Sequence, residues 1–446
     1  MEIAGLIPVF GNLFWTLAAF VVALSVIVAV HEYGHYIVGR LCGIHAEVFS
    51  LGFGPVLWSR KDRRGTRWQV AALPFGGYVK FLGDANAASA GADEATMSAL
   101  SAAERRHTMH GAPLWARAAT VAAGPIFNFI LSILVFSAVL MTFGAKTDRV
   151  EVGELYAMPG GSGGLQAGDV ILAVDGMPVA DWKAFYDAGD KQTGTGPWHY
   201  RVSRGGQEVE VEGPPVEPSR ADGIALKSAA INAGLKKGDV ITAIDGQPIK
   251  LFSQMQAAVA KGQGAPMALT VWRDGSEQTL TLTPRPTDVP KAGGGFETAY
   301  KIGLQGDIFF MPATRTASLT EVIPAAARQV WDVITNSLSA LWHMISQQIS
   351  RCNMSGAIGI AQATGEVASQ GLPDFIWFIA VLSTAVGFMN LFPIPMLDGG
   401  HLVFYTIEWA LGRPLSPATV NIAMSVGLAI VVFVMAFGLT NDLTCP

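Results

Sequence analysis

Four long stretches without a charged side chain constrain the fold of this chain more than any other feature. They run from Ile3 to Val30, from Ala118 to Ala145, from Phe375 to Leu397 and from Pro414 to Asn441. Each is longer than the ~20 residues that a helix needs to cross the hydrocarbon core of a bilayer. Because 50% of the 446 residues are hydrophobic and only 15% are charged, the sequence predicts a multi-pass α-helical membrane protein with four transmembrane helices and a soluble portion.

Charge and cysteine content argue against several other classes of protein. The formal net charge of -5 gives no reason to expect nucleic-acid binding. The three cysteines form no C-x-x-C pair, so the sequence predicts neither a cysteine-type zinc site nor a disulfide framework. The first apolar stretch is too long for a signal-peptide core and lacks a small-residue cleavage site, so we expect it to be retained.

Basic residues between the first two stretches predict how the chain crosses the membrane. Loops rich in Lys and Arg stay on the cytoplasmic side, so this segment is predicted to be cytoplasmic. The N-terminus, the region from 146 to 372 and the C-terminus are then expected on the outer side. The basic residues are Arg40, Arg60, Lys61, Arg63, Arg64, Arg67, Lys80, Arg105 and Arg106.

An H-E-x-x-H motif follows the first stretch, as His31-Glu32-Tyr33-Gly34-His35. On a helix, positions i and i+4 share one face, so both imidazoles can bind the same metal ion. The carboxylate of Glu32 is then placed to take a proton from a water molecule on the metal. A polar cluster that only joins membrane helices is the alternative, and it would be costly in lipid without a function. The motif therefore predicts one Zn²⁺ and a hydrolytic reaction.

A third zinc ligand is expected far downstream. Asp398 is the only carboxylate between Asp374 and Glu408, and the predicted orientation gives it the same membrane depth as the motif. A lone carboxylate at that depth needs a partner or a metal, and the helix break at Pro393 and Pro395 requires a lined cavity. The alternative is that Asp398 only caps the following helix. Three weaker rivals for the metal are Cys42, His45 and His401.

The outer region contains an internal repeat. The sixteen residues from Gly164 to Val179 align with those from Gly234 to Ile249 at a constant offset of 70, and ten positions are identical. Each copy reads as a strand closed by an Asp-Gly turn and followed by a helix-like stretch. This pattern resembles the PDZ domain, in the variant common in bacterial proteases. A PDZ domain adds an extended peptide to a sheet edge, and a pair of spacers with occluded grooves is the alternative.

The cytoplasmic segment is predicted to form a β-hairpin region. Its strand-like pieces are Glu47 to Phe53, Arg67 to Leu73 and Gly77 to Phe81. A hairpin beside a metal site could present its edge to a substrate, and an ordinary solvated hairpin is the alternative. The Ala-, Ser- and Gly-rich stretch from Ala85 to Ala103 is predicted to be a mobile loop. The hairpin glycines are Gly52, Gly54, Gly76 and Gly77.

Two segments connect the repeat to the third stretch. Pro284 to Gly295 is rich in Pro and Gly and is predicted to be a linker. Glu321 to Arg351 has apolar residues at helical spacing, and with Trp331 and Trp342 it predicts an amphipathic helix at the outer membrane interface. A helix buried in a soluble domain is the alternative.

The whole pattern resembles the site-2 protease family of intramembrane zinc metalloproteases. The resemblance rests on H-E-Y-G-H, on L-D-G-G-H after the proline-broken third stretch, and on the tandem insert between the second and third stretches. It covers nearly the whole chain. Gly124-Pro125-Ile126-Phe127-Asn128 is similar to the G-P-x-x-N motif of the family's second helix. One departure is Ala357, where relatives often have Pro; it lies at a predicted helix start and leaves the chemistry untouched.

The resemblance implies a zinc endopeptidase of the bacterial inner membrane that is surrounded by membrane lipid. Its expected substrates are single-span proteins already trimmed on the outside, such as an anti-sigma factor of the envelope stress response. Remnant signal peptides are a second expected class of substrate. Asn390 is expected to contact the unwound substrate, although an intramembrane Asn could equally bridge helices. The other expected substrate-binding residues are Pro393, Pro395 and the four hairpin glycines.

Two other functions stay open at this point. A membrane scaffold could bind protein tails through its PDZ pair and hold zinc only structurally, and a zinc carrier would need further polar residues along its spans. The predicted segments are helix 1 with the motif (1–40), the cytoplasmic hairpin loop (41–114), helix 2 (115–145), two periplasmic PDZ domains (146–218 and 219–290), a linker with the interfacial helix (291–372), helix 3 with the L-D-G motif (373–405) and helix 4 (414–441).

Overall fold

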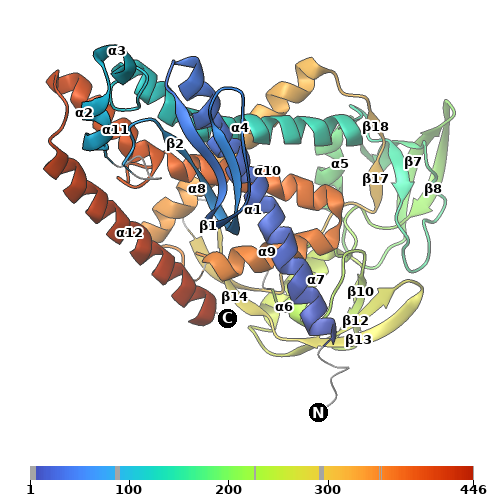
Figure 1. The fold of residues 1–446 in the computed structure, drawn as a ribbon. Helices are drawn as coiled ribbons and strands as arrows, with labels where there is room; N and C mark the ends of the chain where they lie inside the picture. Colours follow the sequence, from blue (N-terminus) through green and yellow to red (C-terminus); the bar gives the residue numbers. More distant parts are fainter. Residues whose placement is uncertain are drawn as a thin grey trace. The chain divides into compact units, whose positions relative to one another are not determined.

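The computed structural model describes residues 7–85, 91–225, 228–290, 296–350, 352 and 354–444 (Figure 1). The chain divides into two compact units, one formed by residues 1–139, 319–345 and 351–446 and the other by residues 140–318 and 346–350. The first is mainly helical and the second mainly β-stranded, as expected for a membrane protein of mixed α and β structure. Parts of four predicted segments lie outside the described residues: Ile3 to Val30, Ala85 to Ala103, Pro284 to Gly295 and Glu321 to Arg351.

Among the described residues, four helices are long and apolar enough to cross a membrane, as predicted. The first continues without a break through the H-E-x-x-H motif. The third ends at Asn390 rather than at the predicted Leu397, because Pro393 and Pro395 lack the N–H groups that would continue a helix. The four are α1 (Ile7–Leu41), α4 (Leu114–Phe143), α10 (Leu372–Asn390) and α12 (Pro417–Thr444).

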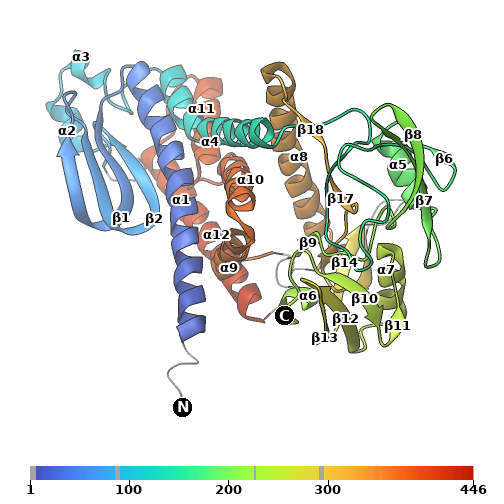
Figure 2. The ribbon, with the colours of Figure 1, turned by 90° about the vertical axis from the view of Figure 1, so that its right-hand side faces the viewer.

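A further helix, α9 (Ala357–Gln370), lies against α1 (Figure 2) and begins at Ala357, where the family resemblance placed a helix start. A Cβ atom on Gly365 would lie 2.3 Å from Oγ1 of Thr16. The two helices are therefore so close at this point that only glycine fits between them. The start of α9 is tied to α12, because the carboxylate of Asp442 accepts hydrogen bonds from the amides of Gly356 (3.0 Å) and Gly359 (2.9 Å). Nearby, Cys352 is disulfide-bonded, a bond for which the cysteine spacing gave no support.

The predicted amphipathic helix is α8 (Leu319–Ile345), which ends six residues before Arg351. Its Ala326 and Val330 are buried in a cluster with Phe136 of α4 and Ala380 of α10. Its opposite face is exposed and carries the tryptophans at positions 331 and 342. The helix therefore packs against spanning helices along one side, and its place at a membrane interface stays a prediction.

The predicted hairpin is a sheet built from two long strands, β1 (Ala46–Lys61) and β2 (Arg67–Phe81), which lies beside α1 in Figure 2. Both strands bend at glycines with positive φ, Gly52 at 89° and Gly76 at 139°. Each therefore contributes two segments, and the register places them in the order 77–81, 46–51, 67–70, 56–61. The sequence missed the last segment. The described part of the predicted mobile loop contains two short helices, α2 (Glu94–Ala99) and α3 (Ala102–Arg105).

The internal repeat forms two sheets with the same strand order. In the first copy β6-β5-β7-β8 are Met177–Pro178, Val170–Val174, Trp198–Arg204 and Gln207–Gly213, with helix α5 (Trp182–Gly189). In the second copy β11-β10-β12-β13 are Gln247–Pro248, Val240–Ile244, Met267–Arg273 and Ser276–Leu282, with helix α7 (Phe252–Lys261). The helices and the turns fall where the repeated sequence predicts them.

Identical residues of the repeat make identical contacts. The guanidinium of Arg204 donates to the buried carboxylate of Asp169 at 2.7 Å, and Arg273 donates to Asp239 at 2.6 Å. Burial would raise the pKa of Asp169, but hydrogen bonds from Arg204 and from the amide of Gln166 hold it below its ordinary value. Each copy thus contains the same ion pair between a buried carboxylate and a partly exposed arginine, which fixes the loop before its first strand.

The second unit does not end at residue 290, as the predicted boundaries had it. Ile308, Phe309 and Phe310 are fully buried in the core of the first repeat, and Ile302 is buried in that of the second. These contacts join residues far apart in sequence, so local patterning gives no sign of them. Four strand pairs are involved: β3 (Ala145–Lys146) with β18 (Thr314–Arg315), β4 (Val152–Leu155) with β17 (Phe310–Pro312), β9 (Gly223–Ile224) with β16 (Leu304–Gln305), and β14 (Arg285–Pro290) with β15 (Phe296–Lys301).

Candidate active site

Two imidazoles project from one face of α1, one helical turn apart. His31 and His35 are largely buried, and their Nε2 atoms lie 3.2 Å from each other. The spacing of four residues produces this arrangement, because it brings side chains to the same side of a helix. Both nitrogen atoms therefore face one small volume in the helical unit.

Asp398 completes a cluster with the two histidines. Its Oδ2 lies 3.1 Å from Nε2 of His31 and its Oδ1 lies 3.5 Å from Nε2 of His35. Nitrogen and oxygen atoms of the three side chains lie within 4.8 Å of one another, and no other such group of His, Cys, Asp or Glu occurs in the described part of the chain. Two imidazoles and one carboxylate form a donor set that zinc takes in catalytic sites, where a fourth position stays open. The residues present therefore fit a zinc ion.

The loop between α10 and α11 (Asp398–Leu411) delivers this carboxylate to the histidines. A Cβ atom would lie 2.2 Å from the carbonyl oxygen of Leu391 if Gly399 carried one, and 2.3 Å from that of Ile394 if Gly400 did. Only glycine therefore allows so tight a return of the chain. The residue at the N-cap of α11 is Leu397, so the alternative role of Asp398 as the cap is not found.

Polar groups of α4 orient the two imidazoles from behind. Nδ1 of His35 lies 2.9 Å from the carbonyl oxygen of Thr120, so this nitrogen carries the proton and leaves Nε2 as the acceptor. Nδ1 of His31 lies 3.2 Å from the side-chain amide of Asn128. The amide oxygen of Asn128 is buried and, among the described residues, has no hydrogen-bond partner, so turning the amide over would let it accept from Nδ1. Both imidazoles would then present Nε2 to a metal.

Sequence reasoning did not give these two residues a role at the metal. The only signal for Asn128 was its place in the G-P-x-x-N motif, and Thr120 had none, because its backbone oxygen makes the contact. Asn128 is itself held in place, since its carbonyl oxygen accepts hydrogen bonds from the hydroxyls of Ser132 (2.9 Å) and Ser383 (3.0 Å). The site is thus supported by both α4 and α10.

Gly124 makes room for the cluster, which predicts the effect of adding one methyl group. A Cβ atom there would lie 2.3 Å from Nε2 of His35 and 2.8 Å from Cε1 of His31. We expect Gly124→Ala to lower zinc affinity by at least about tenfold, since displaced ligands bind metal poorly. The measurement is a chelator competition with the purified protein.

A matched control for this substitution exists in the same unit. Gly365→Ala creates an equally close contact, 2.3 Å from Oγ1 of Thr16, away from the imidazoles. It should cost stability and leave zinc affinity unchanged. Equal losses of zinc affinity in both variants would show that Gly124 serves general packing only.

Glu32 faces the edge of the β1–β2 sheet. A Cβ atom on Gly77 would lie 3.1 Å from Cγ of Glu32 and 3.0 Å from Val28, so the segment 77–81 lies directly against α1 at the motif. In the described residues this segment pairs with 46–51 on one side only. A carboxylate therefore stands between the histidine pair and a strand edge.

The other predicted site residues are not all brought to the cluster. Gly52 and Gly54 pack on Leu73 at the bend of the sheet, and Gly76 packs on Phe53. Pro395 lies against Gly427 of α12, whereas Pro393 is exposed and Asn390 ends α10. Of the rival ligands, Cys42 packs on the apolar cluster beneath the sheet, and neither His45 nor His401 joins the metal-type group.

Comparison with known proteins agrees with this site. The chain matches the Peptidase family M50 over residues 19–434. It is 34% identical over 438 residues to "Putative zinc metalloprotease Atu1380" of Agrobacterium fabrum, with 97% of each chain covered. It is 33% identical to the regulator of sigma-E protease RseP of Salmonella typhimurium (97% of this chain and 99% of the relative) and of Escherichia coli (96% and 98%).

A solved structure also matches in part. It is the PDZ domain of the SdrC-like protein of Listeria monocytogenes, 16% identical over 20% of this chain and 84% of its own length. Its TM-score of 0.16 is too low to support a shared fold.

The spanning helices and the H-E-x-x-H site define the class of membrane metalloproteases. The chain belongs to peptidase family M50, the site-2 proteases. It is a zinc metalloendopeptidase.

Proposed function

We propose that His31, His35 and Asp398 hold the zinc ion and that Glu32 is the general base of a site that cuts transmembrane segments. The observation that carries this proposal is the convergence of the three donor groups from α1 and α11 within the helical unit. When bound, zinc supplies a Lewis acid and lowers the pKa of a water molecule to near neutrality. The alternative is a scaffold with structural zinc. It does not explain why the carboxylate of Glu32, which is not one of the three donor groups, lies beside the histidines.

The chain's own residues supply the proton transfers and the orientation. Glu32 accepts a proton from the attacking water and later delivers it to the leaving amine. Because Glu32 directly follows one of the proposed ligands, its carboxylate is close enough to both groups for these two transfers. Thr120 and Asn128 hold the imidazole rings by Nδ1. The ring positions are therefore set before substrate arrives.

A helical substrate has to unwind before it can be cut, because its carbonyl groups are hydrogen-bonded internally. The free side of the segment 77–81 is suited to take the unwound chain as an added strand beside Glu32. In this proposal the glycines of the sheet let a second backbone approach. The substrate is also contacted by Asn390 at the end of α10 and by the non-helical segment that contains Pro393 and Pro395. The expected substrate-contacting glycines are Gly52, Gly54, Gly76 and Gly77.

The proposed setting is the bacterial inner membrane, with the metal site near the cytoplasmic side and the repeat unit in the periplasm. The excess of Lys and Arg between the first two spans supports this orientation. So does the disulfide at Cys352, since the periplasm is oxidising. The relatives' names mention sigma-E regulation, which supports a substrate that controls a sigma factor. We propose that this substrate is a single-span anti-sigma factor, already trimmed on the outer side. Remnant signal peptides are further candidates.

Metal removal tests the proposed hydrolysis directly. We expect a strong chelator to stop cleavage of a single-span reporter by the purified protein in liposomes, and added zinc to restore it. A scaffold would bind the reporter and leave it whole with or without zinc. Cleavage that continues after the zinc has been removed would contradict the proposal.

The repeat unit is proposed to be a tandem of PDZ domains that keeps bulky outer domains away from the site. The equal strand orders of its two sheets support the tandem. The chain enters and leaves this unit through β3 and β18, where Lys146 pairs with Thr314. Replacing residues 148–312 by a short Gly-Ser linker therefore leaves the two ends side by side.

We expect this deletion variant to cut both an untrimmed reporter with a folded outer domain and its trimmed form, whereas the full chain cuts only the trimmed one. The same deletion with Glu32→Gln is the control and should cut neither. The measurement is the ratio of the two cleavage rates. An unchanged ratio would contradict a filtering role and would leave the metal site untouched.

A further inference from the structure

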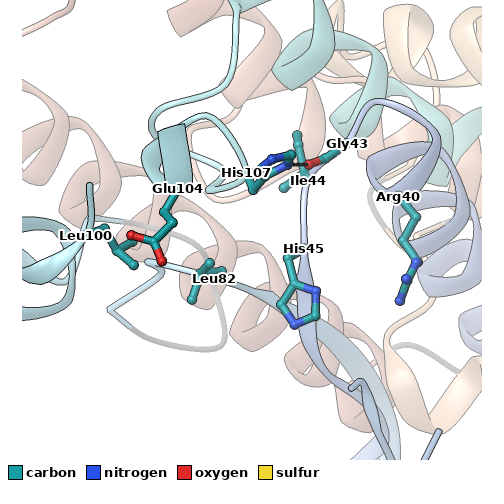
Figure 3. A pocket seen from close by; sticks show the side chains of 8 residues that line it. All are labelled: Arg40, Gly43, Ile44, His45, Leu82, Leu100, Glu104 and His107. Carbon is teal, nitrogen blue, oxygen red and sulfur yellow. Dashed lines mark hydrogen bonds between the residues drawn. The ribbon is translucent and has the colours of Figure 1, made fainter. Parts of the chain in front are cut away.

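A cavity lies at the C-terminal end of α1, and none of its lining residues belongs to the metal-type cluster. Its volume is about 430 Å³, and Figure 3 shows the side chains around it. The walls come from the end of α1, the turn into β1, and the segment with α3. The lining residues are Arg40, Gly43, Ile44, His45, Leu82, Leu100, Glu104 and His107.

One side of this cavity is basic. The guanidinium of Arg40 donates to Oγ1 of Thr66 (3.0 Å) and to the hydroxyl of Tyr36 (3.5 Å). In the described part of the chain it forms no direct ion pair, and its charge is one of the causes that lower the pKa of the Asp62 carboxyl, which accepts from the same hydroxyl of Tyr36 (3.4 Å). The side chain of His45 lines the same cavity (Figure 3). Nδ1 of His107 lies 2.7 Å from the carbonyl oxygen of Gly43 and donates its proton there, so Nε2 of this ring is an acceptor. The N–H groups that can reach an anion in this cavity therefore belong to Arg40 and His45.

The opposite side is acidic. In Figure 3, Glu104 and Arg40 stand at opposite ends of the cavity, with His45 between them. One oxygen of Glu104 accepts hydrogen bonds from the hydroxyl (2.6 Å) and the amide (2.9 Å) of Ser101, and these bonds hold the pKa of Glu104 below its ordinary value. The group is therefore ionised at neutral pH, and its other oxygen can accept from a cation.

A ligand that fits both ends carries an anion and a cation on one short chain. The cavity lies at the end of the candidate span Leu13–Leu41. In the membrane orientation proposed above, this end of the helix is the one that faces the cytoplasmic lipid headgroups. The side chains of Ile44, Leu82 and Leu100 give it an apolar wall. A phosphate matches the guanidinium, which binds phosphate oxygens with two parallel donors. A primary ammonium has three N–H donors for the carboxylate, whereas a quaternary ammonium has none.

We propose that this cavity binds the phosphoethanolamine headgroup of a membrane phospholipid, with the phosphate at Arg40 and His45 and the ammonium at Glu104. The site would fasten the end of α1, which carries the H-E-x-x-H motif, at a constant depth in the membrane. A water-soluble phosphoethanolamine ester has the same charges, and the experiment separates it from the lipid.

The test uses the full-length protein in detergent, titrated with single phospholipids and observed by native mass spectrometry. The wild type should bind phosphatidylethanolamine about tenfold more tightly than phosphatidylcholine, which is the scale of one charge-assisted hydrogen bond. Glu104→Gln should remove this preference, because the neutral amide no longer attracts the ammonium. The fold should remain, since Gln also serves at the third position of a capping box. Arg40→Gln should weaken binding of both lipids.

Matched controls remove the same charges elsewhere in the unit. Arg60→Gln on β1 and Glu94→Gln on α2 change exposed residues outside the cavity and should behave as the wild type. Equal effects in the Glu104 variant and the Glu94 variant, or no preference in the wild type, would overturn the proposal. Glycerophosphoethanolamine without acyl chains should compete weakly; if it displaces the lipid at equal concentration, the ligand is the soluble ester and the membrane source is wrong.

Discussion

Glu32→Gln is expected to lower the rate of reporter cleavage by about 100- to 10,000-fold, the range that a positioned general base contributes. The substitution keeps the size of the side chain and its place against Gly77. It removes the carboxylate that we propose as the acceptor of the proton of the attacking water. The zinc content should stay at the wild-type value, because the proposed donor atoms belong to His31, His35 and Asp398. The measurements are single-turnover cleavage in liposomes and metal analysis of the same preparation.

The control for this variant is Glu47→Gln. Glu47 lies on the same sheet and pairs with Lys80 at 3.1 Å, outside the metal cluster. Its loss should leave cleavage unchanged. If Glu32→Gln retained the wild-type rate, Glu32 would not be the base; if it lost zinc along with activity, its role would be to support the metal.

Asp398→Asn is expected to lower zinc affinity by more than ~100-fold. Removing a residue that only hydrogen-bonds to a metal ligand typically lowers affinity by ~10- to 100-fold, and Asp398 is itself a proposed ligand. The carboxylate lies 3.1 Å from one imidazole and 3.5 Å from the other, and a neutral amide oxygen in its place is a poorer donor to a dication. Cleavage should fall in parallel and recover in part at high zinc concentration. Chelator competition and cleavage at graded zinc concentrations measure both effects.

Asp332→Asn makes the same chemical change on an exposed face of α8 and provides the control. It should leave zinc affinity and cleavage as in the wild type. An Asp398 variant that binds zinc as tightly as the wild type would mean that a different residue is the third ligand.

The helices and the first half of the site could be predicted because their signals are local. Uncharged stretches located the four spans, and the i, i+4 spacing located the two imidazoles on one face of α1. Asp398 could be picked out because it is the only carboxylate near a proline break. The repeat was visible because two segments share ten residues, and both copies fold into sheets of the same order.

The remainder depends on contacts between distant residues and could not be predicted. Phe309 and Phe310 complete the core of the first repeat from a segment that reads as a linker. The helix α9 lies in a stretch of small residues, and its glycine contact with Thr16 has no signal in the sequence. Asn128 and the carbonyl of Thr120 support the imidazoles from another helix, which only the packing of α4 on α1 reveals.

The most direct test of the central claim is X-ray absorption at the zinc edge of the purified protein. Two imidazoles and one carboxylate predict nitrogen and oxygen neighbours alone, at about 2.0–2.2 Å, with the multiple-scattering pattern of histidine. One zinc per chain with this spectrum would agree with His31, His35 and Asp398 as ligands. A sulfur neighbour at about 2.3 Å, or a spectrum without imidazole, would contradict the assignment.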